Sequence, residues 1–227
     1  TPLRAFFVGA NSYYNLAIGN NGSNGVYLGK DNMLIEKPFS EDNLLERNVT
    51  KIKTFSEEID IPVSMLVVPS KGYIYNGYLP ANALEYKDEE YFDFIEKNLG
   101  DKINFVNILN EFNSASSDNK LFFKTDHHWT SLGAYSAYSS LCDAMGLDKK
   151  SENDFNIESY DNFYGTSYST SAYYLTKREE IEVWRDKESL GVADVEIIEG
   201  QKSEKYDNMF FDDNLNHRQL RKNQGAF

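Results

Sequence analysis

The sequence predicts an α/β fold in which a parallel sheet lies between two layers of helices. Two apolar runs, "VSMLVV" (63–68) and "INFVNI" (103–108), are continuous rather than alternating, as in strands that are covered on both faces. Amphipathic helical patterns stand before, between and after these runs. This alternation of strands and helices is typical of a three-layer α/β protein.

The region before the first apolar run carries a predicted hairpin and a predicted helix. Residues 1–39 are expected to form a short apolar helix or strand, a Gly/Asn loop and a hairpin "VYLGKDNMLI" that turns at "KDN". From Ser40, a suitable N-cap, apolar residues recur at helical spacing. They are Leu45, Val49, Ile52, Phe55 and Ile59.

Two further helices and a strand-rich region follow. The segment "DEEYFDFIEKNLG" is predicted to be helical from Asp88, as its cap, to Gly100. Another helix is expected after Thr130 or Ser131, ending at Gly146. Beyond residue 150, "EEIEVWRD" and "VADVEIIEG" alternate like two strands of one hairpin joined through "KESLG". We therefore expect an α/β core with an N-terminal hairpin at 1–150, and a hairpin-rich lobe of the same domain at 151–227.

Composition narrows the possible partners. The chain has 36 acidic and 23 basic residues, and its net charge of −13 argues against a nucleic-acid partner.

With Cys142 alone, no disulfide can form within the chain, and we expect this thiol in the core. The sequence holds no apolar run of the length that a membrane-spanning helix needs. The chain starts at Thr1 rather than at Met, and we expect that a preceding segment was removed.

The segment "TDHHW" (125–129) is the strongest candidate for a functional site, because it contains two of the three histidines. If it is extended, Asp126 and His128 share one face and His127 points to the other. An aspartate beside a histidine orients the imidazole as a general base requires. The segment precedes a predicted helix, at the kind of strand-to-helix junction where α/β proteins place their sites.

The segment allows two other interpretations. In a purely structural one, His127 and His128 bond to backbone carbonyls and cap a corner of the fold. In a metal-binding one, Asp126, His127 and His128 are suitable zinc or manganese ligands. Adjacent histidines on a strand would point apart, and the two-metal phosphoesterases that share the letters "DHH" need histidines upstream, which are absent before residue 127. No metal is therefore predicted.

The surrounding sequence resembles a known family. The segment "KTDHHWTSLGAYSAY" is similar to the signature of bacterial DHHW proteins, which are related to the SGNH-hydrolase-like alginate O-acetyltransferases. Further blocks match in the same order over essentially the whole chain. They are "TPLRAFF", "NGVYLGKDNMLIE", "LVVPSKGYIYNGYLP" and "FYGTSYSTSAYYLTKREEIEVW". The resemblance implies a three-layer SGNH-hydrolase-like sheet, the last strand of which we do not find in this sequence.

The resemblance also implies a chemistry. Asp126 and His128 would be two members of a Ser-His-Asp triad, whereas His127 replaces a small residue and inherits no catalytic role. The triad would transfer an acetyl group to a sugar hydroxyl, as an O-acetyltransferase, or to water, as an esterase. The implied partner is a polysaccharide or acetylated glycan, without a cofactor, and the implied location is extracellular or at the cell surface.

The nucleophilic serine is the missing part of this pattern. In the family it follows the histidine, at the end of a buried strand, and no such strand with a "DS" step occurs after residue 200. We therefore expect the serine to lie outside this chain. Ser70, Ser167 and Ser169 are the candidates within it. The alternative is a cell-surface carbohydrate-binding or interaction domain without turnover, in which tyrosine-rich loops would contact the glycan.

Overall fold

The computed structural model describes residues 4–38, 43–116, 120–188, 195–199 and 202–206. These residues form two compact units. The first unit comprises Thr1–Lys149 and Tyr164–Glu179, and the second comprises Lys150–Phe163 and Glu180–Phe227. The segment 164–179, which we assigned to the lobe, thus groups with the first unit. The expected domain boundary at residue 150 stays a prediction.

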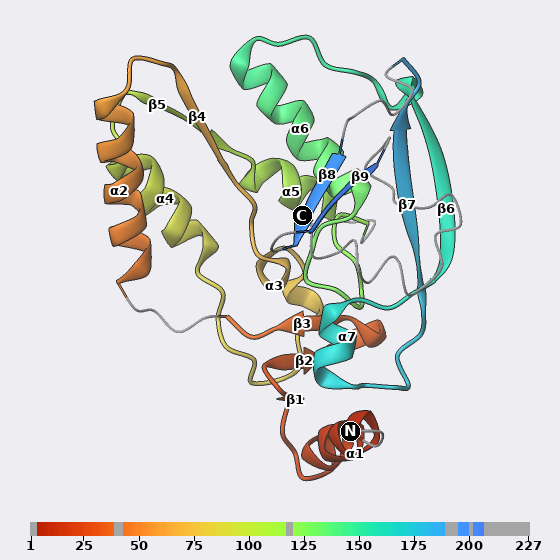
Figure 1. Ribbon diagram of the computed structural model, residues 1–227. Helices are drawn as coiled ribbons and strands as arrows, with labels where there is room; N and C mark the ends of the chain where they lie inside the picture. Colours follow the sequence, from red (N-terminus) through yellow and green to blue (C-terminus); the bar gives the residue numbers. More distant parts are fainter. Residues whose placement is uncertain (1–3, 39–42, 117–119, 189–194, 200–201, 207–227) are drawn as a thin grey trace. The chain divides into compact units, whose positions relative to one another are not determined.

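A parallel pair of strands forms the centre of the first unit. Strand β4 (Val63–Val67) pairs with β5 (Ile103–Asn107), with Val63 opposite Ile103. Helices α2 (Leu44–Glu58) and α4 (Asp88–Asn98) cover one face of the pair, as Figure 1 shows. The contact is an apolar cluster built around Val49, Ile95, Leu99 and Ile103.

A second layer of helices covers the opposite face. It consists of α5 (Leu109–Ala115) and α6 (Ser131–Met145). Their core cluster includes Val106, Ile108, Phe112, Phe122 and Ala137. The predicted three-layer α/β arrangement is therefore confirmed. The expectation that β4 is fully covered was wrong, because each of its five residues is only half-buried.

The N-terminal part folds as a helix followed by a small antiparallel sheet. Helix α1 (Arg4–Ala17) precedes β1 (Gly22–Ser23), β2 (Val26–Leu28) and β3 (Leu34–Glu36). The predicted hairpin is β2–β3, and "KDN" is its turn, a 3-10 segment η1 (Lys30–Asn32). Asp31 and Asn32 have φ angles of 54° and 60°, a region that suits Asp and Asn in tight turns.

The helix ends follow the sequence in part. Thr130 caps α6 by accepting the N–H of Gly133, and Gly146 ends the helix with a φ of 64°. Ser40, the expected cap of α2, lies outside the described residues, and Asn43 occupies the N-cap position. Asp88 is the first residue of α4 rather than its cap, and its carboxylate instead accepts the N–H and O–H of Ser70.

Three short helical segments complete the first unit. Helix α3 (Lys71–Ile74) begins just after the carboxyl end of β4, and the 3-10 segment η2 (Asn76–Tyr78) follows it. Helix α7 (Thr166–Ser171) lies in the first unit and contacts β2, β3 and α1.

Cys142 is buried on α6, as expected. Among the described helices, none has the length and apolar character needed to cross a membrane.

The second unit contains two strand pairs. Strand β6 (Phe155–Phe163), which follows the 3-10 segment η4 (Glu152–Asp154), pairs with β7 (Glu179–Asp186). Strand β8 (Val195–Glu199) pairs with β9 (Lys202–Tyr206) in antiparallel register. We expected "EEIEVWRD" and "VADVEIIEG" to pair with each other. This was wrong, because each of these segments pairs with a different strand.

Candidate active site

The segment that carries the two histidines is a tight loop rather than an extended strand. The N–H of Thr130 donates to the carbonyl of Leu121 at 2.9 Å, and the N–H of Phe123 donates to that of His128 at 3.3 Å. Residues 124–127 form the tip of this loop and have no strand pairing. The expected alternation of side chains between two faces therefore does not apply here.

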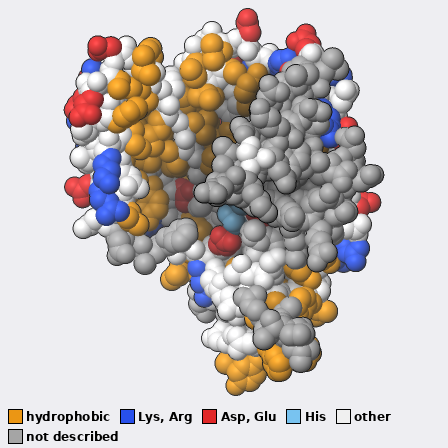
Figure 2. Space-filling view, viewed as in Figure 1, with side chains coloured by type: hydrophobic (Ala, Val, Ile, Leu, Met, Phe, Trp, Pro, Cys, Tyr) orange, Lys and Arg blue, Asp and Glu red, His pale blue; other side chains and the backbone are white. Residues whose placement is uncertain are grey.

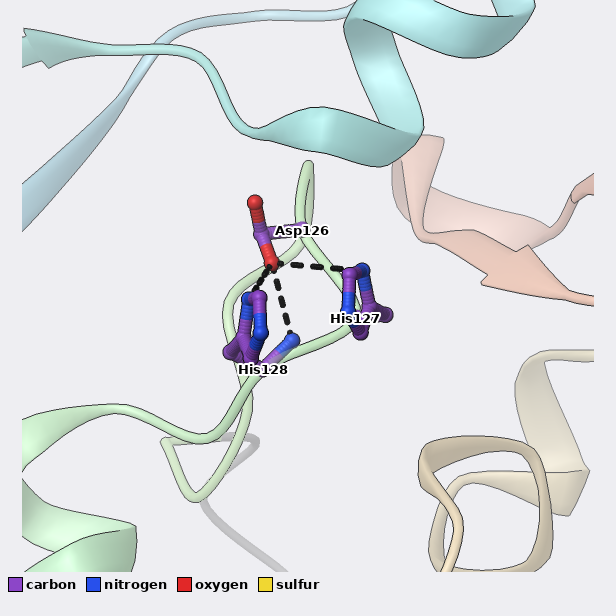
Figure 3. A group of neighbouring side chains, drawn as sticks. All are labelled: Asp126, His127 and His128. Carbon is purple, nitrogen blue, oxygen red and sulfur yellow. Dashed lines mark hydrogen bonds and ion pairs between the residues drawn. The ribbon is translucent and has the colours of Figure 1, made fainter. Parts of the chain in front are cut away.

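Asp126 and His128 form a close pair at the tip of this loop. Nδ1 of His128 lies 2.6 Å from Oδ1 of Asp126, and the same oxygen accepts the backbone N–H of His128 at 2.9 Å. The side chain of Asp126 is 1% exposed, whereas that of His128 is 45% exposed. Figure 3 shows both contacts. The carboxylate is thus sequestered while the imidazole that it orients reaches the surface.

The other carboxylate oxygen of Asp126 is held by helix α7. Oδ2 accepts the N–H of Thr166 at 2.6 Å and its hydroxyl at 3.0 Å. Burial raises the pKa of Asp126, but the hydrogen bonds from Thr166 and His128 and the nearby imidazole outweigh it, so the pKa lies below its usual value. Asp126 is therefore an anion at neutral pH, as a partner for an imidazolium must be.

His127 lies on the same side as His128. The ring centroids of the two histidines are 3.8 Å apart, with 36° between the ring planes, and both rings face Asp126 in Figure 3. Nδ1 of His127 is 2.9 Å from the Thr166 hydroxyl and 3.3 Å from Oε1 of Glu36. The expectation that His127 points to the opposite face was wrong, because the chain turns between the two histidines.

This arrangement reopens the question of a metal, since one ligand atom from each of Asp126, His127 and His128 can be chosen within 4.8 Å of one another. Nδ1 of His128 lies 2.6 Å from Oδ1 of Asp126, which is a hydrogen-bonding distance, and Nδ1 of His127 lies 3.6 Å from the same oxygen. The four hydrogen bonds to Asp126 also occupy its acceptor positions. The donor set therefore favours a hydrogen-bonded pair over a shared ion.

Glu179 holds the backbone on the N-terminal side of the pair. Its carboxylate accepts the N–H groups of Lys124 and Thr125, each at 2.6 Å, and the Thr125 hydroxyl. The Thr125 hydroxyl also accepts the N–H of Gly165, at 3.0 Å. The loop is thereby tied to the segment that carries α7.

Gly165 is required where α7 approaches Asp126. A Cβ atom at this position would lie 2.3 Å from Cβ and 2.4 Å from Oδ2 of Asp126. Any larger side chain would displace either the carboxylate or α7. The close approach lets the N–H of Thr166 reach Asp126 directly.

Lys71 lies beneath the loop and is 5% exposed. Its Nζ atom lies 2.5 Å from the carbonyl oxygen of Leu34, 3.2 Å from that of Lys124 and 3.0 Å from that of Asp126. Burial lowers the pKa of this lysine to about 7, against the opposing effect of the carboxylates of Glu179, Asp126 and Glu36.

A cavity of about 820 Å³ in the first unit opens at the imidazole rings. Its lining includes His127, His128 and Trp129, the segment 36–38 at the end of β3, and mostly apolar residues of α2, α4 and the β4–α3 connection. Figure 2 shows a histidine at the surface of a hollow, beside acidic side chains, with hydrophobic side chains nearby. The exposed edge of the Asp126–His128 pair therefore faces space that a ligand could occupy.

The three candidate serines have partners other than His128. The Ser70 hydroxyl donates to Asp88 at 2.6 Å, that of Ser167 to Glu36 at 3.3 Å and that of Ser169 to the Gly165 carbonyl at 3.2 Å. Within the described part of the chain, the imidazole of His128 hydrogen-bonds only to Asp126. None of the three serine hydroxyls therefore hydrogen-bonds to the imidazole of His128.

Sequence reasoning missed the residues that hold the pair in place. Gly165, Thr166 and Glu179 occur in the block "FYGTSYSTSAYYLTKREEIEVW", and Lys71 occurs in "LVVPSKGYIYNGYLP". Within these blocks, only Ser70, Ser167 and Ser169 were singled out as candidate site residues. All four lie at least 39 positions from Asp126 along the chain, so no local pattern links them to it.

Solved structures show the same fold. Bacillus cereus PatB1 with a sulfonyl adduct matches with a TM-score of 0.64 and 18% identity, over 80% of this chain and 63% of that one. A DHHW family protein from Eubacterium siraeum matches with a TM-score of 0.59 and 19% identity, over 71% and 55% of the two chains. Together with the three-layer core, these likenesses show that the fold is shared with these proteins.

The family follows from the sequence match. Residues 39–161 match the model of the SGNH hydrolase-like domain of the acetyltransferase AlgX, and the chain belongs to this family. The probable alginate O-acetylase AlgJ of Pseudomonas putida is 28% identical over 138 residues. That match covers 56% of this chain and 35% of AlgJ, so the chain spans about a third of this relative.

Proposed function

We propose that this chain provides the Asp-His part of an acyl-transfer site that moves acetyl groups on a polysaccharide. The observation that carries the proposal is the 2.6 Å contact between Oδ1 of the sequestered Asp126 and Nδ1 of the exposed His128. Membership of the AlgX-type family supports it, as does the name of the AlgJ relative, an alginate O-acetylase.

In this proposal His128 is the general base and Asp126 orients it. Because Nδ1 faces Asp126, Nε2 is the atom available to a serine hydroxyl. The hydroxyl gives its proton to Nε2 as its oxygen attacks the acetyl carbonyl, and that proton passes to the leaving alcohol. An acceptor hydroxyl then attacks the acetyl-serine, and its proton passes through His128 to the serine oxygen.

The serine and the acceptor complete the proposal. We propose that the serine lies outside the chain, since Ser70, Ser167 and Ser169 have other partners. A sugar hydroxyl as acceptor makes the protein an O-acetyltransferase, and water makes it an esterase. Polysaccharide as partner implies a place outside the cell or at its surface.

Release of acetate from a chromogenic acetate ester, with and without soluble polysaccharide, tests this proposal. The assay compares this chain with the chain plus any sequence that its gene encodes after Phe227, each as wild type and as His128→Ala. We expect the wild type with the added sequence to release acetate and to place acetyl groups on the polysaccharide. His128→Ala should abolish both activities. Turnover that His128→Ala leaves unchanged would refute the proposal.

A second function, glycan binding without turnover, has one observation in its favour. Partly exposed aromatic side chains, among them Tyr86, Tyr91 and Trp129, line the same cavity as the imidazoles, and such side chains can stack on sugars. Glycan binding that persists in His128→Ala, without release of acetate by the wild type, would favour this function.

A further inference from the structure

Lys71 is unusual because a lysine is rarely buried without a carboxylate partner in contact. Its side chain is 5% exposed, yet all three acceptors at its ammonium group are backbone carbonyls. An ammonium has three N–H donors and no acceptor. The donors are therefore all engaged, and none remains for a ligand.

The three carbonyls belong to two segments that are far apart in the sequence. Leu34 is in β3, whereas Lys124 and Asp126 form the loop that carries the two histidines. The carbonyl of Lys124 also accepts the N–H of Leu34 at 2.8 Å. Lys71 itself begins α3, at the carboxyl end of β4. The ammonium thus joins the loop to β3 and to the central sheet.

The charge of Lys71 complements its surroundings. Glu179, Asp126 and Glu36 all act on it electrostatically from around the loop. Glu179 holds N–H groups of the loop at Lys124 and Thr125, while Lys71 holds carbonyls at Lys124 and Asp126. The carboxylate of Glu179 therefore holds backbone N–H groups of the loop, and the ammonium of Lys71 holds its backbone carbonyls.

We propose that Lys71 is a positioning residue for the Asp126–His128 pair, because its ammonium fixes the backbone of the loop from which both side chains project. The inference rests on the proposed function, because positioning of the pair affects a reaction only if the pair is catalytic. It names Lys71 as acting through the backbone of Asp126 rather than on a substrate.

The first test observes the pair directly and needs no turnover. With only three histidines in the chain, the proton on Nδ1 of His128 can be followed by NMR as a low-field resonance. We expect this resonance in the wild type, its loss in Lys71→Met at the same pH and temperature, and its retention in Lys102→Met. Lys102 is a matched control because it is exposed, with Nζ 3.4 Å from the Glu57 carbonyl. A folded Lys71→Met that keeps the resonance would overturn the proposal.

Hydrogen exchange at the lysine ammonium groups of the wild type keeps the test decisive if Lys71→Met does not fold. At pH 6, with lysine labelled at ¹⁵Nζ, we expect one ammonium that is protected from exchange and shows NOEs to Leu34 and Asp126. Exposed lysines should exchange rapidly. If no lysine ammonium is protected, the contacts of Lys71 with the three carbonyls are contradicted, and the proposal with them.

Kinetics separate this inference from the proposed function. Where turnover is measurable, Lys71→Met should lower kcat about a hundredfold, as misplacement of a catalytic group does, with little change in KM. If Lys71→Met loses the His128 resonance, and the wild type shows no turnover even with any sequence encoded after Phe227, the positioning role is upheld and the catalytic one is refuted. A lower kcat with the resonance intact would overturn the positioning role alone.

Discussion

Nδ1 of His128 and Oδ1 of Asp126 lie 2.6 Å apart within one loop, two residues from each other in the sequence. The same carboxylate oxygen accepts the N–H of His128, so backbone and side chain of the histidine converge on one atom. Helix α7 supplies the remaining hydrogen bonds to Asp126, through Thr166. The pair is local in sequence, but its orientation depends on distant segments.

A methyl group at position 165 should disturb the contact between α7 and the carboxylate of Asp126. Gly165→Ala would place Cβ 2.4 Å from Oδ2 of Asp126, so α7 or the carboxylate must move. Because overpacking costs about 1–3 kcal/mol, we expect a lower free energy of unfolding in urea titrations and loss of turnover. Gly77→Ala is the matched control, since its Cβ would meet no atom within 4 Å. Equal stability of the two variants would contradict this packing.

The lowered pKa of Asp126 predicts a dependence of stability on acid. In the unfolded chain this carboxyl takes up its proton near pH 4, before the folded protein does. Its contribution is therefore fully present at neutral pH and is lost as the pH falls below about 4. The difference in unfolding free energy between wild type and Asp126→Asn should shrink from pH 7 to pH 3. A constant difference over this range would mean that Asp126 titrates normally in the folded protein.

Glu179 should contribute to stability through the loop backbone. Glu179→Gln removes the charge that holds the N–H groups of Lys124 and Thr125, and bonds to charged groups contribute about 1.5–3 kcal/mol. We expect a loss of about 1–2 kcal/mol in urea unfolding, since glutamine keeps one acceptor oxygen. Glu96→Gln, on the exposed side of α4, should stay within about 0.5 kcal/mol of wild type. The interpretation fails if both substitutions have the same effect.

The sequence predicted the framework because its signals are local. Continuous apolar runs marked β4 and β5, helical spacing marked α2, and a turn signal between apolar runs marked the hairpin β2–β3. The Asp126–His128 pair was also expected, since both residues stand in one motif. The reason given for it was wrong, because it assumed an extended strand where the structure has a loop.

The rest of the site could not be predicted because it depends on tertiary contacts. Lys71 and Thr166 reach Asp126 from 55 and 40 positions away, and neither has a pattern that distinguishes it from an ordinary surface residue. The contact between the rings of His127 and His128 likewise follows from the path of the loop. The predicted pairing of strands in the second unit was wrong for a similar reason. Alternation of apolar and polar residues identifies strands but not their partners.

His127 should matter far less than His128. Its Nδ1 atom lies 3.6 Å from Oδ1 of Asp126, against 2.6 Å for Nδ1 of His128. It also contacts Thr166 and Glu36. Since one hydrogen bond contributes about 0.5–1.5 kcal/mol, His127→Ala should lower kcat by no more than about tenfold. Steady-state kinetics with a chromogenic acetate would check this. A loss as large as that in His128→Ala would make His127 part of the reacting group.

The central claim is that Asp126 and His128 act as one catalytic unit. A double-mutant cycle of kcat/KM for acetate-ester cleavage tests it, using wild type, Asp126→Asn, His128→Ala and the double variant, each with any sequence encoded after Phe227. Members of such a unit are not additive, so the double variant should be no slower than His128→Ala, and Asp126→Asn should lose roughly 10⁴-fold. Independent, multiplicative losses, or full activity in either single variant, would contradict the account.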